Sequence, residues 1–270
     1  MVTLYNITNF DLAQTLDCGQ AFRWELRSDG SFTGVAMGKR LTLTLDGSTL
    51  TIDGIDENEY LNVWAEYFDL NRNYGEIGNT LSQLHPILRE AYDYAPGIRI
   101  LAQEPWEALC SFIISQNNNI PRIKLIIGRL CEAYGDEIED SVYSFPCAEK
   151  LAGLSVDDLS PIKAGFRARY IIDAAQKVSG GEVDLDELKR APLDEAKARL
   201  MTITGVGPKV ADCTLLYGLH RLESFPLDVW MKRAMSRLFP ELTPKDFGEY
   251  GGIAQQYIFH YSRMHPELFE

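Results

Sequence analysis

The chain has 270 residues, of which 46% are hydrophobic and 24% are charged, so it can bury a large core in one or two compact domains. This composition excludes a disordered chain, a collagen and a small disulfide-bonded protein. The 39 acidic and 26 basic side chains give a net charge of −13, so any nucleic acid must be held locally rather than by excess Lys and Arg. Five cysteines in no metal-like or disulfide-like spacing favour a reducing cytoplasm. No signal peptide is expected, and no apolar run approaches the roughly 20 residues that a membrane helix needs.

Two kinds of pattern follow one another along the chain. Residues 31–54 alternate apolar and polar side chains around Asp46-Gly47, which predicts antiparallel strands and a hairpin. From Glu57 the apolar spacing becomes helical, and helix-sized segments follow Pro96-Gly97 almost to the end. We therefore predict an α+β protein, with an antiparallel β domain carrying helices over residues 1–95 and an α-helical domain over residues 96–270.

Charge is distributed unevenly between these parts. Residues 1–95 contain 14 acidic and 6 basic side chains, a net charge of −8, whereas residues 160–240 contain 10 acidic and 13 basic ones, a net charge of +3. The helical part can therefore present a positive surface in an acidic protein.

Residues 200–213 (LMTITGVGPKVADC) carry the most informative motif. Gly205-Val206-Gly207 separates two predicted helices, and Pro208 opens the second, as a tight helix-hairpin-helix connection requires. Main-chain amides at the start of that helix can bind a phosphate without a basic side chain. On the motif alone, an ordinary helix corner explains these residues equally well.

Lys209 and Asp228 are the candidate catalytic residues. Lys209 lies one turn into the second helix among apolar neighbours, where a desolvated amine is a usable nucleophile. Asp228 precedes a helix-sized segment, so its ordinary role is to cap that helix. A carboxylate held there can also stabilise a cationic sugar or move protons.

Together these residues resemble the helix-hairpin-helix DNA glycosylase superfamily, in particular its lysine-bearing 8-oxoguanine branch. Four further segments match that branch in the family's order: CGQAFRW (18–24), SFIISQNNNIPRI (111–123), AGFRARYI (164–171) and AQQYIF (254–259). The resemblance implies an N-terminal sheet domain similar to the TATA-binding protein, followed by an all-α helix-hairpin-helix (HhH-GPD) domain.

The resemblance also implies a bifunctional glycosylase and abasic-site lyase of base excision repair, which removes 8-oxoguanine opposite cytosine from duplex DNA. Lys209 would attack C1′ of the damaged nucleotide, expel the base and form a Schiff base that permits β-elimination. Asp228 would support the lysine and the oxocarbenium-like sugar. The enzyme would act as a monomer, without a membrane, in the cytoplasm and nucleoid of a prokaryote.

Four residues are expected to read the lesion base once it leaves the base stack. The Gly19 carbonyl would accept the N7 hydrogen that 8-oxoguanine has and guanine lacks. Phe259 and Cys213 would sandwich the base, and Gln255 would bond its Watson–Crick edge. Residues 255 and 259 share one helix face, although a core stripe and a buried thiol explain Phe259 and Cys213 without the resemblance.

Four more residues are expected around the gap that the flipped base leaves. Asn117, Arg122 and Arg167 match the positions that bond the unpaired cytosine, and Phe166 matches the wedge that fills the gap. Arginine donors suit the O2 and N3 acceptors of cytosine. On the pattern alone, phosphate contacts or surface charges are the simpler explanation of both arginines.

The chain departs from the family in several places. Trp230 stands where eukaryotic relatives carry a histidine that helps to hold the DNA backbone, so strand affinity is expected to differ. Phe166 replaces a tyrosine, and Thr204 replaces a frequent proline. The four-cysteine cluster of related enzymes is missing, which implies no iron–sulfur cofactor. No metal is required, although a monovalent cation could bind three hairpin carbonyls: those of Met201, Ile203 and Val206.

Two other functions stay open on the sequence. An alkylpurine glycosylase of the same superfamily shares the layout and the aspartate but usually lacks the lysine, so Lys209 argues against it. A non-catalytic helix-hairpin-helix DNA-binding module would need only the hairpin and would leave Lys209 and Asp228 unused.

Overall fold

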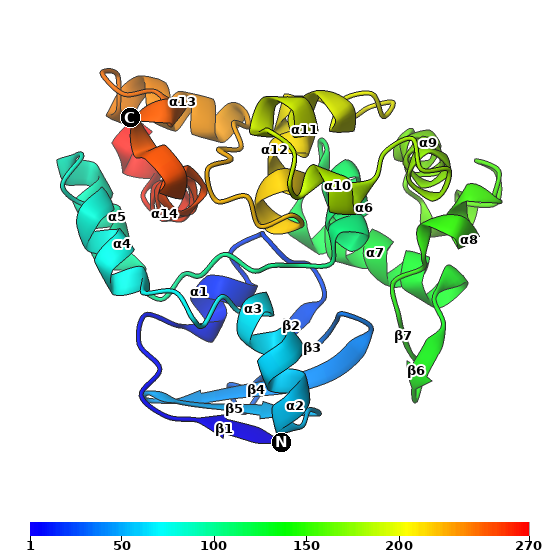
Figure 1. Ribbon diagram of the computed structural model, residues 1–270, viewed down its shortest axis with the longest axis horizontal. Helices are drawn as coiled ribbons and strands as arrows, with labels where there is room; N and C mark the ends of the chain where they lie inside the picture. Colours follow the sequence, from blue (N-terminus) through cyan, green and yellow to red (C-terminus); the bar gives the residue numbers. More distant parts are fainter. Residues whose placement is uncertain (270) are drawn as a thin grey trace.

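A five-stranded sheet forms one end of the protein and a larger group of helices the other, in the computed structural model, which describes residues 1–269 (Figure 1). The strands lie in the order β1-β5-β4-β3-β2, and all neighbouring pairs are antiparallel. They are β1 (Val2–Leu4), β2 (Trp24–Leu26), β3 (Phe32–Ala36), β4 (Lys39–Asp46) and β5 (Thr49–Asp53). The predicted α+β class is confirmed.

The β4–β5 hairpin turns where the sequence predicts it. Asp46 pairs with Thr49, so Gly47 and Ser48 form a two-residue turn, and Gly47 has a φ of +56°. Turns of this length need positive φ, which glycine adopts without steric cost. The alternating pattern buries four side chains of these two strands: Leu41, Leu43, Leu50 and Ile52.

The sheet has a core of its own. Its buried face packs with α1 (Leu12–Leu16) and with a continuous helical segment made of α2 (Glu57–Glu59), the π-helical η1 (Tyr60–Trp64) and α3 (Ala65–Tyr67). Trp64 from this segment and Phe68, which directly follows it, are buried against the sheet, with their ring centroids 6.1 Å apart. The helix predicted from Glu57 is confirmed, and the π-helical turn is a departure from ideal spacing that the apolar pattern does not reveal.

Every helix-sized segment predicted after residue 100 contains a helix. The longer helices are α6 (Pro105–Ser115), α7 (Ile120–Tyr134), α9 (Arg167–Ser179), α11 (Leu193–Leu200), α12 (Pro208–Tyr217), α13 (Val229–Leu238) and α14 (Gly251–Met264). Shorter ones are α8 (Ala148–Ala152), α10 (Leu185–Leu188), η2 (Ser160–Ile162), η3 (Pro244–Tyr250) and η4 (Pro266–Phe269). Helices α6, α7 and α12 have Pro in the first turn, where its missing N–H costs no hydrogen bond.

The helical core begins before the expected domain boundary. Helices α4 (Tyr74–Leu81) and α5 (Pro86–Tyr94) bury Leu81 and Leu88 in the same cluster as α6 to α14, and α5 packs against α14 (Figure 1). These helices are therefore part of the helical core although they precede residue 95. The division into residues 1–95 and 96–270 stays a prediction.

A small hairpin interrupts the helical part. Strands β6 (Glu137–Glu139) and β7 (Val142–Tyr143) pair with each other after α7. The sequence did not predict them, because two- and three-residue strands with mostly exposed or half-buried side chains leave no alternating apolar pattern.

Arg99 joins the two cores. Its guanidinium donates to the main-chain carbonyls of Thr8, Asn9 and Asp69 at 2.8, 2.9 and 2.6 Å, and it lies 4.6 Å from the centroid of the Tyr74 ring. Burial lowers the pKa of Arg99. The hydrogen bonds of the buried Arg99 guanidinium fix the segment that leads into α6. Helix α6 in turn carries residues of the site described below.

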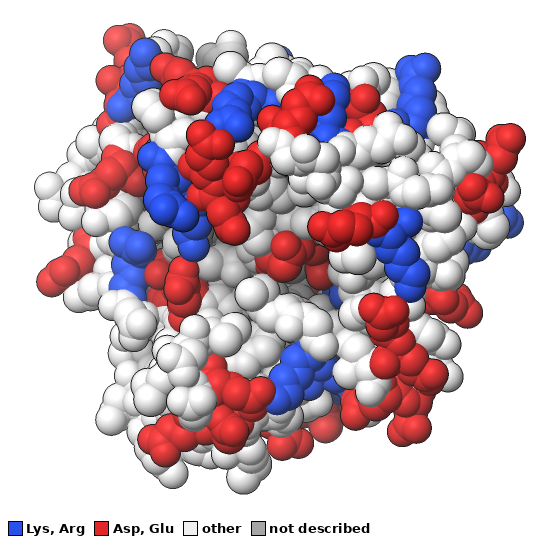
Figure 2. Space-filling view, turned by 45° about the vertical axis from the view of Figure 1, so that its right-hand side comes forward, with Lys and Arg blue, Asp and Glu red and all other residues white. Residues whose placement is uncertain are grey.

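Charged side chains of both signs are mixed on the face shown in Figure 2, which has no broad basic field. Within residues 1–269, none of the helices has the length and apolar character that crossing a membrane requires.

Candidate active site

A small cavity collects most of the residues predicted to act on the lesion. Its volume is about 50 Å³. Six predicted residues line it: Gly19, Lys209, Cys213, Asp228, Gln255 and Phe259. Four residues that the sequence interpretation did not name complete the lining: Phe112, Tyr217, Pro226 and Gln256. The volume suits about one or two water molecules, so a flipped purine can enter only when side chains of the wall move.

Lys209 is held at the cavity by a hydroxyl and an aromatic ring. It is half-buried at the second position of α12, in the first turn and not one turn in as the sequence suggested. Its Nζ donates to Ser115 Oγ at 3.2 Å and lies 5.2 Å from the centroid of the Phe112 ring. Both partners come from α6, which packs against α12. The two helices therefore aim the amine into the cavity rather than into solvent.

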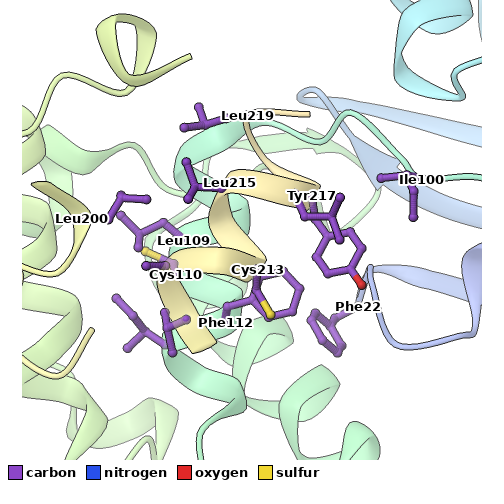
Figure 3. Close-up of a cluster of buried hydrophobic side chains, with 14 of the residues drawn as sticks. Phe22, Ile100, Leu109, Cys110, Phe112, Leu200, Cys213, Leu215, Tyr217 and Leu219 are labelled. Atoms are coloured by element: carbon purple, nitrogen blue, oxygen red, sulfur yellow. The ribbon is translucent and has the colours of Figure 1, made fainter. Parts of the chain in front are cut away.

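Cys213 follows Lys209 by one helical turn. Its side chain is buried among the aromatic residues Phe112 and Tyr217, as Figure 3 shows. Burial raises the pKa of Cys213 to about 11, although the nearby Lys209 acts in the opposite direction. At neutral pH the wall of the cavity therefore presents a thiol, which is an apolar surface suited to the face of a base.

Asp228 caps α13 and also lines the cavity. Its Oδ1 accepts from the main-chain N–H of Met231 at 2.7 Å, so the predicted N-cap is confirmed. Asp228 is half-buried and lines the same cavity as the Cys213 thiol. The capping role and a position beside the reacting sugar are compatible, because the cap occupies only one carboxylate oxygen.

Gly19 has a φ of +97°, a conformation that favours glycine. The buried amide of the next residue, Gln20, fixes this loop. Gln20 Nε2 donates to the carbonyls of Thr15 and Arg99 at 2.8 Å each, and its Oε1 accepts from Leu101 N at 2.9 Å. The Gly19 main chain is therefore held rigidly at the cavity wall. Gln20 was not singled out from the sequence, although it stands within the CGQAFRW segment.

Gln255 and Phe259 lie on the same face of α14, as their spacing predicts. Gln255 is buried, and its Oε1 lies 3.4 Å from the Tyr217 hydroxyl oxygen. Phe259 is half-buried, with the Arg263 guanidinium 5.4 Å from its ring centroid. Both residues line the cavity, so they are more than an ordinary core stripe.

The hairpin between α11 and α12 is fixed to α9. Gly205 has a φ of +81°, and a Cβ atom there would lie 2.3 Å from the Tyr170 ring. The Thr204 amide donates to Asp173 Oδ2 at 2.7 Å. Burial raises the pKa of Asp173, but the Thr204 amide and Lys177 outweigh it, and the net shift is downward. Asp173 thus remains charged and anchors the hairpin, a role that the sequence did not reveal.

The first turn of α12 is open to a phosphate. Gly207 is the N-cap, and it forms no side-chain capping hydrogen bond. The free N–H groups of this turn therefore have no side-chain acceptor at the cap, which leaves them available for an anion. Val206 itself is buried, so only main-chain atoms of the turn suit such a contact.

We expect Gly205→Ala to destabilise the protein by about 2–4 kcal/mol, because it combines a positive φ with a clash against the Tyr170 ring. Urea unfolding measures this change. Gly207→Ala is the matched control. Its Cβ would meet nothing within 4 Å and its φ is −95°, so stability should change by less than about 1 kcal/mol while duplex binding weakens. Equal destabilisation by both changes would contradict this account of the hairpin.

The predicted wedge and opposite-base residues lie on one loop system beside α7 and α9. Phe166 is 47% exposed, as a wedge must be, and Asn117 and Arg122 are exposed as well. Arg167 is buried instead. Its guanidinium donates to the carbonyls of Gln116, Asn117 and Ala164, and burial together with the nearby Arg122 lowers its pKa. Arg167 shapes this loop, and its contact with cytosine stays a prediction.

Two further sequence expectations concern neighbouring residues. Asn119 accepts from Arg122 N at 3.0 Å and caps α7, while Asn118 donates to the Ile114 carbonyl, so both serve the loop. Trp230 donates its indole N–H to Ser262 Oγ at 3.3 Å. That hydrogen bond ties α13 to α14 and uses the one donor that Trp230 offers in place of the family's histidine.

Within residues 1–269, no three His, Cys, Asp or Glu side chains are grouped as a metal site would need. The Ile203 carbonyl accepts from Val206 N at 3.0 Å. Since a carbonyl has two lone pairs, this bond leaves room for a cation contact. A monovalent cation on the hairpin, and the lack of an iron–sulfur cofactor, stay predictions.

Comparison with known proteins agrees with this geometry. Residues 2–109 match the family model described as 8-oxoguanine DNA glycosylase, N-terminal domain, and residues 110–246 match the HhH-GPD superfamily of base excision DNA repair proteins. An N-glycosylase/DNA lyase of Saccharomyces cerevisiae is 32% identical over 271 residues, which cover 86% of this chain and 69% of the yeast protein.

Two solved structures are similar over almost the whole chain. The structure of MBOgg1 in complex with a low affinity DNA ligand is 44% identical, with a TM-score of 0.93 and coverage of 98% of this chain and 96% of that one. The Clostridium acetobutylicum 8-oxoguanine glycosylase/lyase, in complex with double-stranded DNA containing cytosine opposite 8-oxoguanine, is 39% identical, with a TM-score of 0.91 and coverage of 98% and 95%. The chain therefore belongs to the 8-oxoguanine DNA glycosylases of the HhH-GPD superfamily, the N-glycosylase/DNA lyases of base excision repair.

Proposed function

We propose that this enzyme binds the flipped 8-oxoguanine of duplex DNA in the cavity between α12 and α14 and attacks its sugar with Lys209. The observation that carries this proposal is the meeting of Lys209, Asp228 and Gly19 in one cavity, although they are far apart in the sequence. An amine, a carboxylate and a main-chain carbonyl at the cavity wall are the groups that the reaction needs at one place.

The chemistry follows from these groups. The nitrogen lone pair of Lys209 forms a bond to C1′ while the bond from C1′ to the base breaks, and the base leaves with that electron pair. A proton passes from the new C1′-bound nitrogen to the departing base. The nitrogen lone pair then opens the sugar ring, O4′ takes a proton from water, and a protonated Schiff base results. Loss of a C2′ proton then expels the 3′ phosphate by β-elimination. Asp228 stabilises the positive charge that develops on the sugar, which is worth most where water is excluded.

Lesion recognition uses main chain and side chains for different parts of the base. The Gly19 carbonyl accepts the N7 hydrogen, Gln255 pairs with the Watson–Crick edge, and Phe259 and Cys213 hold the two faces. Among these contacts, the one to the N7 hydrogen separates 8-oxoguanine from guanine. A glycine is apt there because its main chain can approach the base closely.

Exposed loop residues hold the opposite strand, and the hairpin holds the lesion strand. Phe166 enters the gap, and Asn117 and Arg122 bond the unpaired cytosine. The hairpin Gly205-Val206-Gly207 holds a phosphate of the lesion strand through its main-chain amides, of which that of Val206 also donates to the Ile203 carbonyl. The enzyme acts as a monomer, since one chain supplies every group in this scheme, and it works at the nucleoid of a prokaryote, where its duplex substrate lies.

The opposite-base preference is tested by single-turnover excision from duplexes with 8-oxoguanine opposite C, A, G or T. We expect the C duplex to react fastest, because arginine donors match the acceptors of cytosine and not the donor N6 of adenine. Arg122→Gln should reduce the ratio of the C rate to the A rate. An A duplex that reacts as fast as the C duplex in the unchanged protein would contradict this part of the proposal, and release of an alkylated purine alone would favour the alkylpurine alternative.

A further inference from the structure

Gln256, the residue after Gln255, is a second amide at the lesion cavity. It is 1% exposed and lines the cavity. Its Oε1 accepts from the Tyr217 hydroxyl at 2.5 Å. Its Nε2 is buried and has no hydrogen-bond partner in the part of the chain that the structure describes.

An unpaired amide N–H in a buried position is unfavourable, because the group has lost its water and gained nothing in return. Turning the amide over does not remove the problem. The Tyr217 hydroxyl could then accept from Nε2, but the oxygen would lose its partner instead. One polar atom of Gln256 therefore stays unsatisfied in the free protein, in a residue that lines the cavity.

Tyr217 determines which atom of the Gln256 amide lacks a partner. Its hydroxyl has a single hydrogen to donate. The hydroxyl oxygen lies 2.5 Å from Gln256 Oε1 and 3.4 Å from Gln255 Oε1, so the hydrogen is donated to Gln256. The Tyr217 ring is itself fixed by stacking on Phe112, with centroids 5.2 Å apart and planes 23° from parallel (Figure 3). A fixed hydroxyl holds the oxygen of the amide, so the nitrogen is the atom left for a ligand.

We propose that Gln256 is a further lesion-recognition residue, which donates from Nε2 to a carbonyl oxygen of the flipped base while Tyr217 fixes the orientation of its amide. The inference rests on the proposed function of the cavity. It identifies the ligand as an oxo-purine, because a free N–H donor needs an acceptor. A guanine-type base offers carbonyl O6 and 8-oxoguanine adds O8, whereas adenine presents an amino donor at the corresponding position.

The test uses the two activities of the enzyme, only one of which involves a base. Gln256→Met keeps the length of the side chain and removes both amide atoms. Excision of 8-oxoguanine is measured as the maximal single-turnover rate divided by the enzyme concentration that gives half of it. We expect this ratio to fall about tenfold, which is the effect of one lost hydrogen bond. Strand cleavage at a preformed abasic site should stay within about twofold, since no base is present there.

A control lies one residue further along α14. Tyr257 also buries a polar atom without a partner in the described chain, its hydroxyl, but it does not line the cavity. Tyr257→Phe should leave both activities unchanged. Tyr217→Phe should lower excision less than Gln256→Met does, and adding it to Gln256→Met should cause little further loss, because the two residues act through one hydrogen bond.

The outcomes separate cleanly. Excision and abasic cleavage that fall together would show that Gln256 only supports the structure, and unchanged excision would show that it does not touch the base. Either result would overturn the inference. Failure of the proposed function looks different, since the unchanged protein would then lack both activities.

Discussion

Lys209→Gln is expected to lower base excision and abasic-strand cleavage by on the order of 10³-fold or more while duplex binding persists. The reason is that both steps need the same amine, whereas the glutamine amide has no nucleophilic lone pair of comparable strength. Ser115 Oγ and the Phe112 ring, which now contact Nζ, can accommodate the amide with little repacking.

Single-turnover assays with 8-oxoguanine duplexes and with preformed abasic duplexes measure the two rates, and a gel-shift titration measures binding. Lys245→Gln removes an exposed lysine away from the cavity and should leave all three unchanged. An appreciable excision rate in Lys209→Gln would mean that another nucleophile attacks the sugar.

Asp228→Asn is expected to lower the single-turnover rate by on the order of 10²-fold with little change in affinity or stability. Asparagine caps helices about as well as aspartate, so its side-chain oxygen can keep the bond to Met231 N. The variant therefore removes charge from the cavity without removing the cap. This separation of roles makes the variant more informative than an alanine.

Thermal unfolding and single-turnover kinetics of Asp228→Asn should be compared with those of Asp184→Asn. Asp184 caps α10 in the same way, through a bond from Glu187 N, but lies outside the cavity. We expect both variants to unfold like the parent and only Asp228→Asn to lose activity. A rate that stays at the parent value would show that Asp228 serves the helix alone.

Much of the fold follows from local pattern. The β4–β5 turn at Gly47 and the Pro-initiated starts of α6, α7 and α12 are set by residues within a few positions, which is why the sequence predicts them. The π-helical turn at Tyr60–Trp64 and the β6–β7 hairpin depend on packing and on a few main-chain hydrogen bonds. Such effects produce no regular spacing of apolar residues in the sequence.

The site divides in a similar way. Lys209 and Asp228 were singled out from the residue pattern, and Gly19, Gln255 and Phe259 through the family resemblance. All five line one cavity. Tyr217 and Gln256 were not, because an aromatic and an amide on amphipathic helices look like ordinary core and surface residues until the helices are packed. Arg167 shows the opposite case. The resemblance predicts that it contacts DNA, but its guanidinium donates to three main-chain carbonyls of the protein.

Borohydride trapping tests the central claim most directly. The unchanged protein and Lys209→Gln are incubated with a duplex that carries 8-oxoguanine opposite cytosine, beside an undamaged duplex, and the products are reduced and separated under denaturing conditions. We predict a lesion-dependent covalent protein–DNA product that maps to Lys209 by peptide mass and is lost in Lys209→Gln. Release of the base without any covalent product would contradict the account, because it would show that water, and not Lys209, attacks the sugar.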